Sequence, residues 1–389
     1  MAEAQDDAPE APRTGRRSAA RITGRGLIAL FSAVVLGTTA TGWFLLDRLD
    51  DVSSSTVLAE PAAPDEAEPP PPRDDGALDL LLVGSDSRTD AHGNPLPESV
   101  LRELRTESSP GLNTDTLVVV RVPHDGAAPT AVSIPRDTYT EVPGGRPEKI
   151  NAVYGLAKAA AAREEGADEA GSRLAGQRAL VRTVQRLTGV RIDRYAEINL
   201  LGFYEITEAV GGVRVCLRQA TSDPDSGADF AAGPQRIAGG DALAFVRQRG
   251  GLPRGDLDRI VRQQVFMASL AGEVFSSGTL TDPARLNGLI AALRRSVVLD
   301  QDWDVMAFAQ RMRELAAGGV SFVTLPLTGV GLRDDRDRSI VTVDPPAVRD
   351  FFAGLVAPPP PGLAPAAPLR LDATAQPPPI TSDGVPCVN

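Results

Sequence analysis

The sequence predicts an α/β fold, a layered sandwich in which helices flank a central mixed β-sheet, preceded by one transmembrane helix. Three observations lead to the fold class. Residues 78–83 form an apolar run that ends at Gly84, which is typical of a buried strand. Residues 116–122 and 130–134 are rich in β-branched side chains and flank a turn, which indicates a hairpin. Helical and strand patterns then alternate along the chain, and a hairpin within such an alternation makes the sheet mixed.

Each remaining element is predicted from the same local patterns. Residues 150–188 are long and Ala-rich but carry a polar break at 164–172, so we expect two helices, the second over 173–187. The other expected helices lie at 203–210, 241–248, 256–275, 283–298, 303–316 and 345–355. The other expected strands lie at 195–198, 213–217, 320–325 and 339–343.

A stretch without charged side chains near the N-terminus, residues 26–46, predicts a membrane-spanning helix. At a rise of roughly 1.5 Å per residue, such a helix spans about 30 Å, the thickness of a bilayer core. Arginines precede it in residues 1–25 and aspartates follow it. We therefore expect a single-pass protein of the cell membrane, with a cytoplasmic N-terminus and an extracytoplasmic C-terminal domain. The alternative is a cleaved signal peptide, but the apolar stretch is long for one.

Two Pro- and Ala-rich segments enclose a single predicted domain at residues 78–355. Residues 47–77 are also acidic and predict a disordered stalk, and residues 356–389 predict an extended strap. The strap carries Cys387, and the domain carries the other cysteine, Cys216. An even pair of cysteines outside the cytoplasm predicts a disulfide that ties the strap to the domain, with two unpaired thiols as the alternative.

The charge balance argues against one class of partner and favours another. The formal net charge is -11, which argues against general binding of nucleic acid. Lys149 and Lys158 are the only lysines, so almost every cation in the chain is a guanidinium. Guanidinium groups are planar and carry several hydrogen-bond donors, which suits phosphate.

Two carboxylates next to predicted strands are candidate metal ligands. Asp86 and Arg88 follow the strand at 78–83, where ligand groups are commonly presented in open α/β sheets. Asp115 precedes the first strand of the hairpin and offers a second carboxylate, and Mg²⁺ sites commonly use one or two. The alternatives are a turn with a local ion pair at Asp86 and Arg88, and an Asx-turn at Asp115.

Two further clusters supply cations. Arg136 and Asp137 close the hairpin, and Lys149 precedes the next helix. Residues 247–262 contain five arginines against two aspartates, an excess of three positive charges. Converging arginines bind diphosphate through charge-assisted hydrogen bonds, whereas the alternative is a solvated, Arg-rich surface. The candidate diphosphate-binding residues are Arg88, Arg136, Lys149, Arg247, Arg249, Arg259 and Gln263.

Eight short motifs follow one another along the chain. They are SDSR at 85–88, NTDT at 113–116, SIPRDT at 133–138, EKINAVYGLA at 148–157, RYAEINLLGF at 194–203, AVGGV at 209–213, GGDALAFVRQR at 239–249 and GDLDRIVRQQ at 255–264. In this order they resemble the successive motifs of the LytR–CpsA–Psr family, and the resemblance covers residues 78–355. The ending with Cys387 is similar to that of actinobacterial members.

The resemblance implies an enzyme that transfers a glycopolymer from a polyprenyl-diphosphate carrier to peptidoglycan and forms a phosphodiester. It implies that Asp86 and Asp115 hold Mg²⁺, or Mn²⁺ in its place, and that an apolar groove between sheet and helices takes the polyprenyl chain. Many members have Arg where this chain has Asn113, so one phosphate contact is expected to be missing or supplied elsewhere. The residues matching the family's phosphate-binding groups are Arg88, Arg136, Arg247, Arg249, Arg259 and Gln263.

The expected chemistry is attack of a sugar hydroxyl on the glycan-side phosphorus, with the lipid monophosphate leaving. The candidate catalytic residues are Asp86, Asp115, Arg136 and Asp137. Asp137 is the candidate base, with Asp86 as the alternative if the metal does not fully engage it. Two other functions stay open: hydrolysis by a polyprenyl-diphosphate pyrophosphatase, and a non-catalytic envelope regulator or scaffold that binds lipid-linked glycans.

Overall fold

The computed structural model describes most of the chain beyond the predicted stalk. The described residues are 52–59, 71, 75–107, 112–164, 166–301, 303–304, 307–308, 311, 320–356 and 386–389. The predicted segments 1–25 and 26–46, and most of the predicted helix at 303–316, lie outside these residues. Among the described residues, no helix combines the length and the apolar character that crossing a membrane requires.

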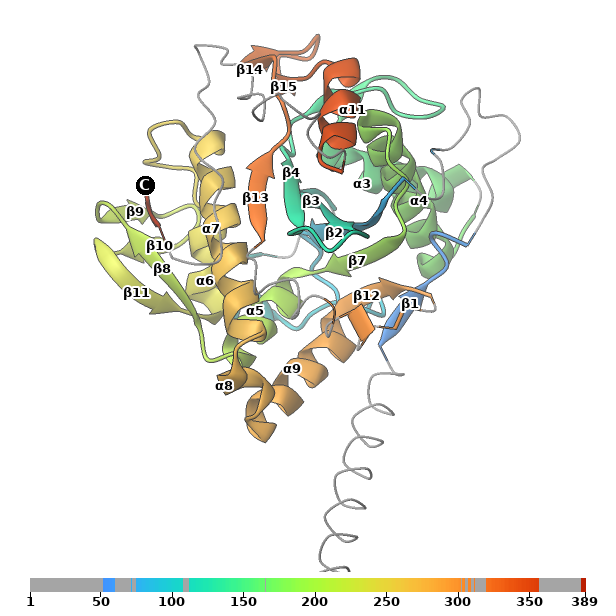
Figure 1. Ribbon diagram of the computed structural model, residues 1–389. Coiled ribbons are helices and arrows are strands. Elements are labelled where there is room, and N and C mark those ends of the chain that lie inside the picture. Colours follow the sequence, from blue (N-terminus) through green and yellow to red (C-terminus); the bar gives the residue numbers. More distant parts are fainter. Residues whose placement is uncertain are drawn as a thin grey trace, which may run out of the picture. The chain divides into compact units, whose positions relative to one another are not determined.

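A seven-stranded mixed sheet lies at the centre of the fold, as the hairpin pattern predicts (Figure 1). Neighbouring strands are antiparallel in the pairs β2–β3, β3–β4 and β7–β12, and parallel in the pairs β2–β7, β1–β12 and β4–β13. In sheet order the strands are β1 (Ser53–Ser55), β12 (Val297–Asp300), β7 (Arg194–Ile198), β2 (Ala77–Ser85), β3 (Thr114–Pro123), β4 (Thr130–Ile134) and β13 (Ser321–Thr324).

Helices cover both faces of this sheet, because its central strands are apolar on both faces. Leu80 and Val118 point into one hydrophobic cluster, whereas Leu81 and Val119 point into another on the opposite face. The first cluster includes side chains of α6 (Gly239–Arg247) and α7 (Asp256–Val274), and α5 (Leu200–Ala209) contributes Phe203 to its margin. The second includes side chains of α3 (Ile150–Glu164), α4 (Glu169–Thr188) and α11 (Pro345–Gly354).

Smaller elements surround the three layers. The remaining helices are α2 (Glu98–Glu103), α8 (Ser277–Leu280) and α9 (Pro283–Ser296). A three-stranded sheet is formed by β11 (Gly233–Ile237), β8 (Val213–Leu217) and β16 (Cys387–Val388). Two-stranded pairs are formed by β9 (Thr221–Asp223) with β10 (Ala228–Phe230), β5 (Tyr139–Thr140) with β6 (Glu148–Lys149), and β14 (Gly329–Arg333) with β15 (Ser339–Thr342).

Several predicted helix boundaries differ from those of the structure, and two of the differences have a clear physical reason. The helix α4 begins at Glu169 rather than at 173, because Asp168 caps it by accepting a hydrogen bond from the backbone N–H of Gly171. The helix predicted at 283–298 ends at Ser296, and Val297 begins strand β12. Pairing of β12 with β7 and β1 on its two sides decides its conformation, and a local pattern does not reveal those partners.

Part of the predicted stalk belongs to the folded domain. Ser53–Ser55 form an edge strand parallel to β12, and Val57 is buried in the same cluster as the helices α3 and α4. Burial of the apolar side chains of Val57 and Leu58 favours this packing. The sequence did not indicate it, because many of the surrounding residues are acidic or proline.

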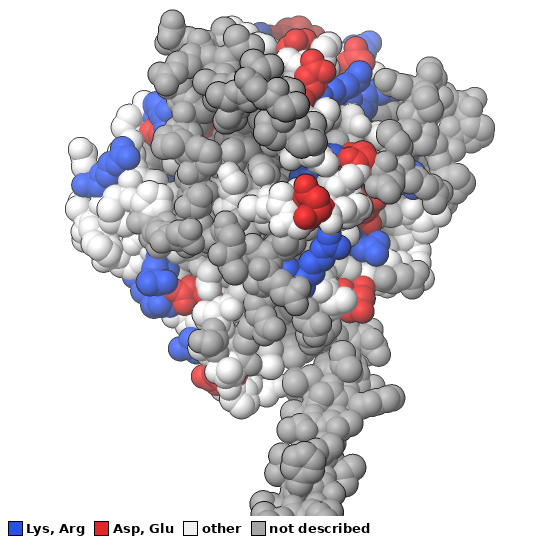
Figure 2. All heavy atoms as spheres, in the orientation of Figure 1, with Lys and Arg blue, Asp and Glu red and all other residues white. Residues whose placement is uncertain are grey.

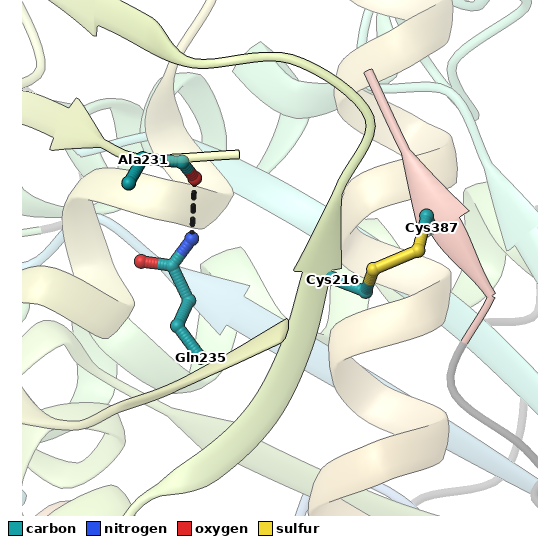
Figure 3. The surroundings of a disulfide bond; sticks show 4 residues. All are labelled: Cys216, Ala231, Gln235 and Cys387. Atoms are coloured by element: carbon teal, nitrogen blue, oxygen red, sulfur yellow. Dashed lines mark hydrogen bonds between the residues drawn. A yellow bond between two sulfur atoms is a disulfide. The ribbon is translucent and has the colours of Figure 1, made fainter. Parts of the chain in front are cut away.

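The predicted disulfide is confirmed. Cys216 and Cys387 are joined, and their two strands run parallel with these residues in register. Figure 3 shows the bond linking β16 to β8, with Gln235 of β11 donating to the backbone oxygen of Ala231 nearby. The two cysteines are 171 residues apart in the sequence. The disulfide therefore fastens residues 386–389 to the domain.

Candidate functional site

Three sheet strands bring the first group of predicted residues to one edge. Strands β2 and β4 are both antiparallel to β3, so the ends of β2 and β4 meet the start of β3. A register shift between Gly84 and Ser85 disrupts the β2–β3 ladder just before Asp86. A side chain at position 84 would lie 2.9 Å from Thr116 Cβ, so a glycine is needed for this close approach.

Asp86 is fixed in place by its backbone and its side chain. Its N–H donates to the backbone oxygen of Asn113 at 2.9 Å, and the N–H of Asn113 donates to Asp86 Oδ1 at 2.7 Å. Arg88 Nη1 lies 3.1 Å from Asp86 Oδ2. The backbone of Asn113 therefore positions Asp86, and this role does not depend on which side chain position 113 carries.

Arg136 is the centre of the carboxylate contacts. Its Nη1 donates to Asp115 Oδ1 at 3.0 Å, and its Nε lies 3.6 Å from Asp256 Oδ1 and 3.7 Å from Asp137 Oδ2. Asp137 is buried, and its Oδ1 accepts a hydrogen bond from Lys149 Nζ at 2.7 Å. The structure thus brings together the four candidates from the hairpin region, Asp115, Arg136, Asp137 and Lys149. The ammonium group of Lys149 is engaged by Asp137.

The helical cations are oriented by the end of α6 and the beginning of α7. The helix α6 ends at Arg247, and Gln248 adopts an extended backbone, so Arg247 and Arg249 flank an inward-turned Gln248. The backbone of Gly255 has φ of 54°, which L side chains rarely adopt, and α7 begins at the next residue.

Arg259 and Gln263 lie on the face of α7 that meets these groups. Arg259 Nη2 lies 2.8 Å from Asp256 Oδ1, and Gln263 Nε2 donates to the backbone oxygen of Val246 at 3.2 Å. Arg247 Nη1 donates to the backbone oxygen of Leu104 at 3.3 Å, beside α2. Since Asp256 contacts both Arg136 and Arg259, the strand-edge group and the helical group form one cluster.

Electrostatics within this cluster show how closely its charges lie. Burial raises the pKa of Asp115, but the guanidiniums of Arg136, Arg259 and Arg249 outweigh burial and the net shift is downward. Burial, reinforced by the neighbouring Arg136 and Arg249, lowers the pKa of Arg259 to about 10 even though Asp256 opposes the shift. Burial and the proximity of Arg88 likewise lower the pKa of Arg247, against the effect of Asp115 and Asp86. The cations repel one another, and an anionic ligand would relieve that repulsion.

The cluster has more positive than negative side chains. Six cations stand against four carboxylates, an excess of two positive charges. The Nε atoms of Arg88, Arg136 and Arg259 are buried without a hydrogen bond. On the face drawn in Figure 2, the described Lys and Arg side chains lie among Asp and Glu rather than in a patch of one sign. The positive excess is therefore a local property of the cluster. The cations are Arg88, Arg136, Lys149, Arg247, Arg249 and Arg259; the carboxylates are Asp86, Asp115, Asp137 and Asp256.

Asp86 and Asp115 are the residues of the cluster that would hold a Mg²⁺ ion whose shell is completed by water and substrate oxygens. Both carboxylates act on the same guanidinium, that of Arg247. Arg136 contacts Asp115 at Oδ1, whereas both oxygens of Asp86 already have partners, the N–H of Asn113 and the guanidinium of Arg88. Among the residues that the structure describes, no three His, Cys, Asp or Glu side chains are grouped to hold a metal. Two carboxylates suffice for Mg²⁺ when water and phosphate oxygens complete its shell.

A small pocket beside the cluster is lined by residues of β3, β4 and α7. Its charged and amide groups belong to Asp115, Arg136, Arg259 and Gln263. Its apolar side chains are those of Leu117, Val118, Ile134, Ile260 and Met267. The space inside has room for little more than a water molecule, so in this conformation it does not hold a lipid chain.

Asp256 is the member of the cluster that the sequence analysis did not select. It appeared there only as a countercharge to the arginines of residues 247–262. Asp256 directly follows Gly255 and lies at the N-terminal end of a long helix, where carboxylates are favoured. This position is the feature of the sequence from which Asp256 could have been selected.

Comparisons with known proteins agree with the motifs. A model of the LytR_cpsA_psr family matches residues 50–346. The cell wall biosynthesis protein LcpA of Corynebacterium glutamicum is 47% identical over 337 residues, which cover 84% of this chain and 64% of LcpA. The teichoic acid transferase TagU of Bacillus cereus (strain AH820), named as acting between polyisoprenyl-teichoic acid and peptidoglycan, is 32% identical over 60% of this chain and 64% of TagU. The chain thus spans less than two thirds of either relative.

Two solved structures share the fold. The LytR-Csp2A-Psr enzyme from Actinomyces oris matches with a TM-score of 0.53 and 20% identity, over 76% of this chain and 95% of the other. B. subtilis TagV matches with a TM-score of 0.52 and 20% identity, over 73% of this chain and 99% of the other. These likenesses concern the architecture, and they agree with the mixed sheet between helices.

Proposed function

Because the chain belongs to the LytR_cpsA_psr family, we propose that it transfers a glycopolymer from a polyprenyl-diphosphate carrier to peptidoglycan. The reaction forms a phosphodiester, so the protein is a phosphotransferase. The name of the relative TagU, a teichoic acid transferase, supports this reaction class. Membership of the family is the outcome that the eight sequence motifs predict.

One observation carries the proposal: the cluster has an excess of two positive charges, and its members Arg136 and Arg259 line a pocket that also contains apolar side chains of the sheet and of α7. A polyprenyl diphosphate has the complementary pair of properties, an anionic head and a hydrocarbon chain. Arg136 and Arg259 both line the pocket, so we assign them to the diphosphate. Bidentate donation from guanidinium groups fixes both the position and the orientation of such an anion.

In the proposed reaction the cluster positions the donor and neutralises charge. A hydroxyl oxygen of peptidoglycan forms a bond to the glycan-side phosphorus, and the bond from that phosphorus to the lipid phosphate breaks. The proton of the hydroxyl passes to a carboxylate, and polyprenyl monophosphate leaves. Arg136, Arg247 and Arg259 stabilise the charge that develops on the phosphoryl oxygens and on the leaving group. Asp137 is the proposed base, with Asp86 as the alternative.

We propose Mg²⁺, or Mn²⁺ in its place, as the cofactor, with Asp86 and Asp115 as its protein ligands. When bound, the ion would neutralise phosphoryl charge and polarise the phosphorus–oxygen bonds. The action of both carboxylates on one guanidinium, that of Arg247, supports this assignment.

We also propose that residues 26–46 anchor the chain in the cell membrane, with residues 1–25 in the cytoplasm and the catalytic domain outside. An anchor would keep the cluster close to carrier lipids in the membrane. The uncharged stretch and the flanking charges support this orientation, and the disulfide agrees with an oxidising compartment.

A transfer assay tests the proposal. The full chain in detergent is incubated with a radiolabelled polyprenyl-diphosphate glycan, peptidoglycan and Mg²⁺, and label is counted in the insoluble wall polymer. Transfer predicts label in peptidoglycan that chelation of Mg²⁺ abolishes. Soluble phosphorylated glycan without wall-bound label would instead identify a pyrophosphatase, and intact donor would leave only the regulator or scaffold role.

The variant Arg136→Ala links this activity to the cluster. We expect transfer to fall by about 100-fold or more, because Arg136 contacts three of the four carboxylates and lines the pocket. Arg349→Ala is the control, since Arg349 lies on α11 outside the cluster and donates to the backbone oxygen of Arg186. Equal activity of the two variants would remove Arg136 from the site.

A further inference from the structure

Gln248 is fully buried between two arginines of the cluster, and its side chain is held on three sides. Its Nε2 donates to Thr221 Oγ1 at 2.6 Å and to the backbone oxygen of Gly250 at 2.8 Å. Its Oε1 accepts from Arg262 Nη1 at 2.6 Å. Because Gln248 lies between Arg247 and Arg249, these three hydrogen bonds determine where the backbone of both arginines runs.

Arg262 is a second fully buried side chain, and it touches none of the four carboxylates of the cluster. It lies over the ring of Phe245, with its Cζ 5.0 Å from the ring centroid. Besides Gln248, it donates through Nε to the backbone oxygen of Asn389. A guanidinium can hold two acceptors in a fixed relative geometry, so Arg262 links the α6–α7 region to residues 386–389.

The segment at 386–389 is itself fixed by the domain. Cys387 is bonded to Cys216, Val388 is buried against the core, and its backbone oxygen accepts from the N–H of Arg218 at 2.8 Å. A continuous series of contacts therefore leads from the disulfide through Asn389, Arg262 and Gln248 to the cluster.

The backbone of the same loop has a further support. Asp223 Oδ2 accepts from the backbone N–H groups of Arg249 and Gly250, each at 3.3 Å. The loop is thus held by Arg262 and by two residues of strand β9, Thr221 and Asp223. Loss of the Arg262 side chain would leave the amide oxygen of Gln248 buried and unpaired. The free-energy cost of an unpaired buried acceptor is large enough to displace the Gln248 side chain.

We infer that Arg262 and Gln248 are positioning residues for the diphosphate site, and that the disulfide-held segment 386–389 sets the placement of Arg247 and Arg249 through them. The inference rests on the proposed function of that site. Its consequence is that the disulfide, although distant in sequence, controls how well the site binds its lipid donor.

Hydrogen exchange of the full chain tests the structural part without any ligand. We expect the amides of residues 247–251 to exchange faster in Arg262→Gln and in the double variant Cys216→Ser/Cys387→Ser than in the oxidised wild type. Arg121→Gln is the matched control, because Arg121 is an equally buried arginine whose partners are Asp75 and Asp79. Unchanged protection of residues 247–251 in both test variants would overturn the inference.

The kinetic part separates positioning from simple loss of folded enzyme. In the transfer assay, Arg262→Gln is expected to raise the KM for the polyprenyl-diphosphate glycan by about tenfold and to leave the KM for peptidoglycan unchanged. Arg121→Gln lowers the active fraction, and hence the apparent kcat, without changing either KM. A donor KM equal to that of the wild type in Arg262→Gln would contradict the inference. If the wild type itself shows no transfer, the proposed function fails while hydrogen exchange still decides this inference.

Discussion

At the scale of single residues, Asp256 is the contact that unites the site. Its Oδ1 lies 2.8 Å from Arg259 Nη2 and 3.6 Å from Arg136 Nε, so it lies between cations from the sheet and from α7. A carboxylate here offsets repulsion between two guanidiniums and fixes their separation. It also repels the diphosphate that the same guanidiniums bind, so its effects on binding and on catalysis have opposite signs.

Replacing Asp256 with Asn should separate these effects. We expect Asp256→Asn to lower kcat by about tenfold or more, because Arg136 and Arg259 lose their common orienting charge. The KM for the lipid donor should stay equal or fall, since a negative charge has been removed beside the phosphates. The control is Asp258→Asn, two residues further along α7, which removes an ion pair with Arg254 at 2.7 Å. A higher donor KM with unchanged kcat in Asp256→Asn would contradict this role.

The candidate site could be predicted from sequence to the level of residue type and motif. Asp86, Asp115, Arg136 and Arg259 were selected because carboxylates and guanidiniums flank predicted strands and a helix, and the structure gathers them. The role of Arg262 could not be predicted, because its partner Asn389 is 127 residues away and local periodicity holds no information about that distance.

At the scale of elements, long periodic segments were predicted well and short ones were not. The strands β2, β3 and β4 and the helix α7 carry their own apolar pattern over five or more residues. Strands of two or three residues, such as β1, β9 and β16, depend on a partner supplied by the fold. The end of α6 was predicted one residue late, and Gln248 leaves the helix because its side chain is drawn into the core.

At the scale of the whole molecule, stability is coupled to pH by a buried charge cluster at the start of β2. Arg121 contacts two carboxylates, Asp75 at 2.5 Å and Asp79 at 3.1 Å, and both Arg121 and Asp79 are almost fully buried. Burial raises the pKa of Asp79 to about 8, although Arg121 opposes the shift. The Asp79 carboxyl is therefore protonated in the folded protein near neutral pH.

The pH dependence of unfolding tests this assignment. Between the ordinary pKa of an Asp, 3.8, and a folded-state pKa of about 8, the folded protein retains a proton that the unfolded chain releases. The contribution of Asp79 to the free energy of unfolding therefore falls as pH rises through this window and is constant above it. Asp79→Asn should remove this contribution, so urea titrations at a series of pH values should show the variant gaining stability relative to the wild type toward pH 8. A difference independent of pH would show that Asp79 does not titrate there.

The central claim is that the arginine–aspartate cluster binds a lipid-linked diphosphate, and affinity for that head group measures it most directly. Equilibrium titrations compare a polyprenyl diphosphate with the polyprenyl monophosphate of the same chain length, for the full wild-type chain and for Arg259→Met. Met retains an apolar stem and removes the charge. The wild type should bind the diphosphate at least about tenfold more tightly than the monophosphate, because the second phosphate gains charge-assisted hydrogen bonds. Arg259→Met should reduce or abolish that preference, and equal affinity of the wild type for the two lipids would contradict the claim.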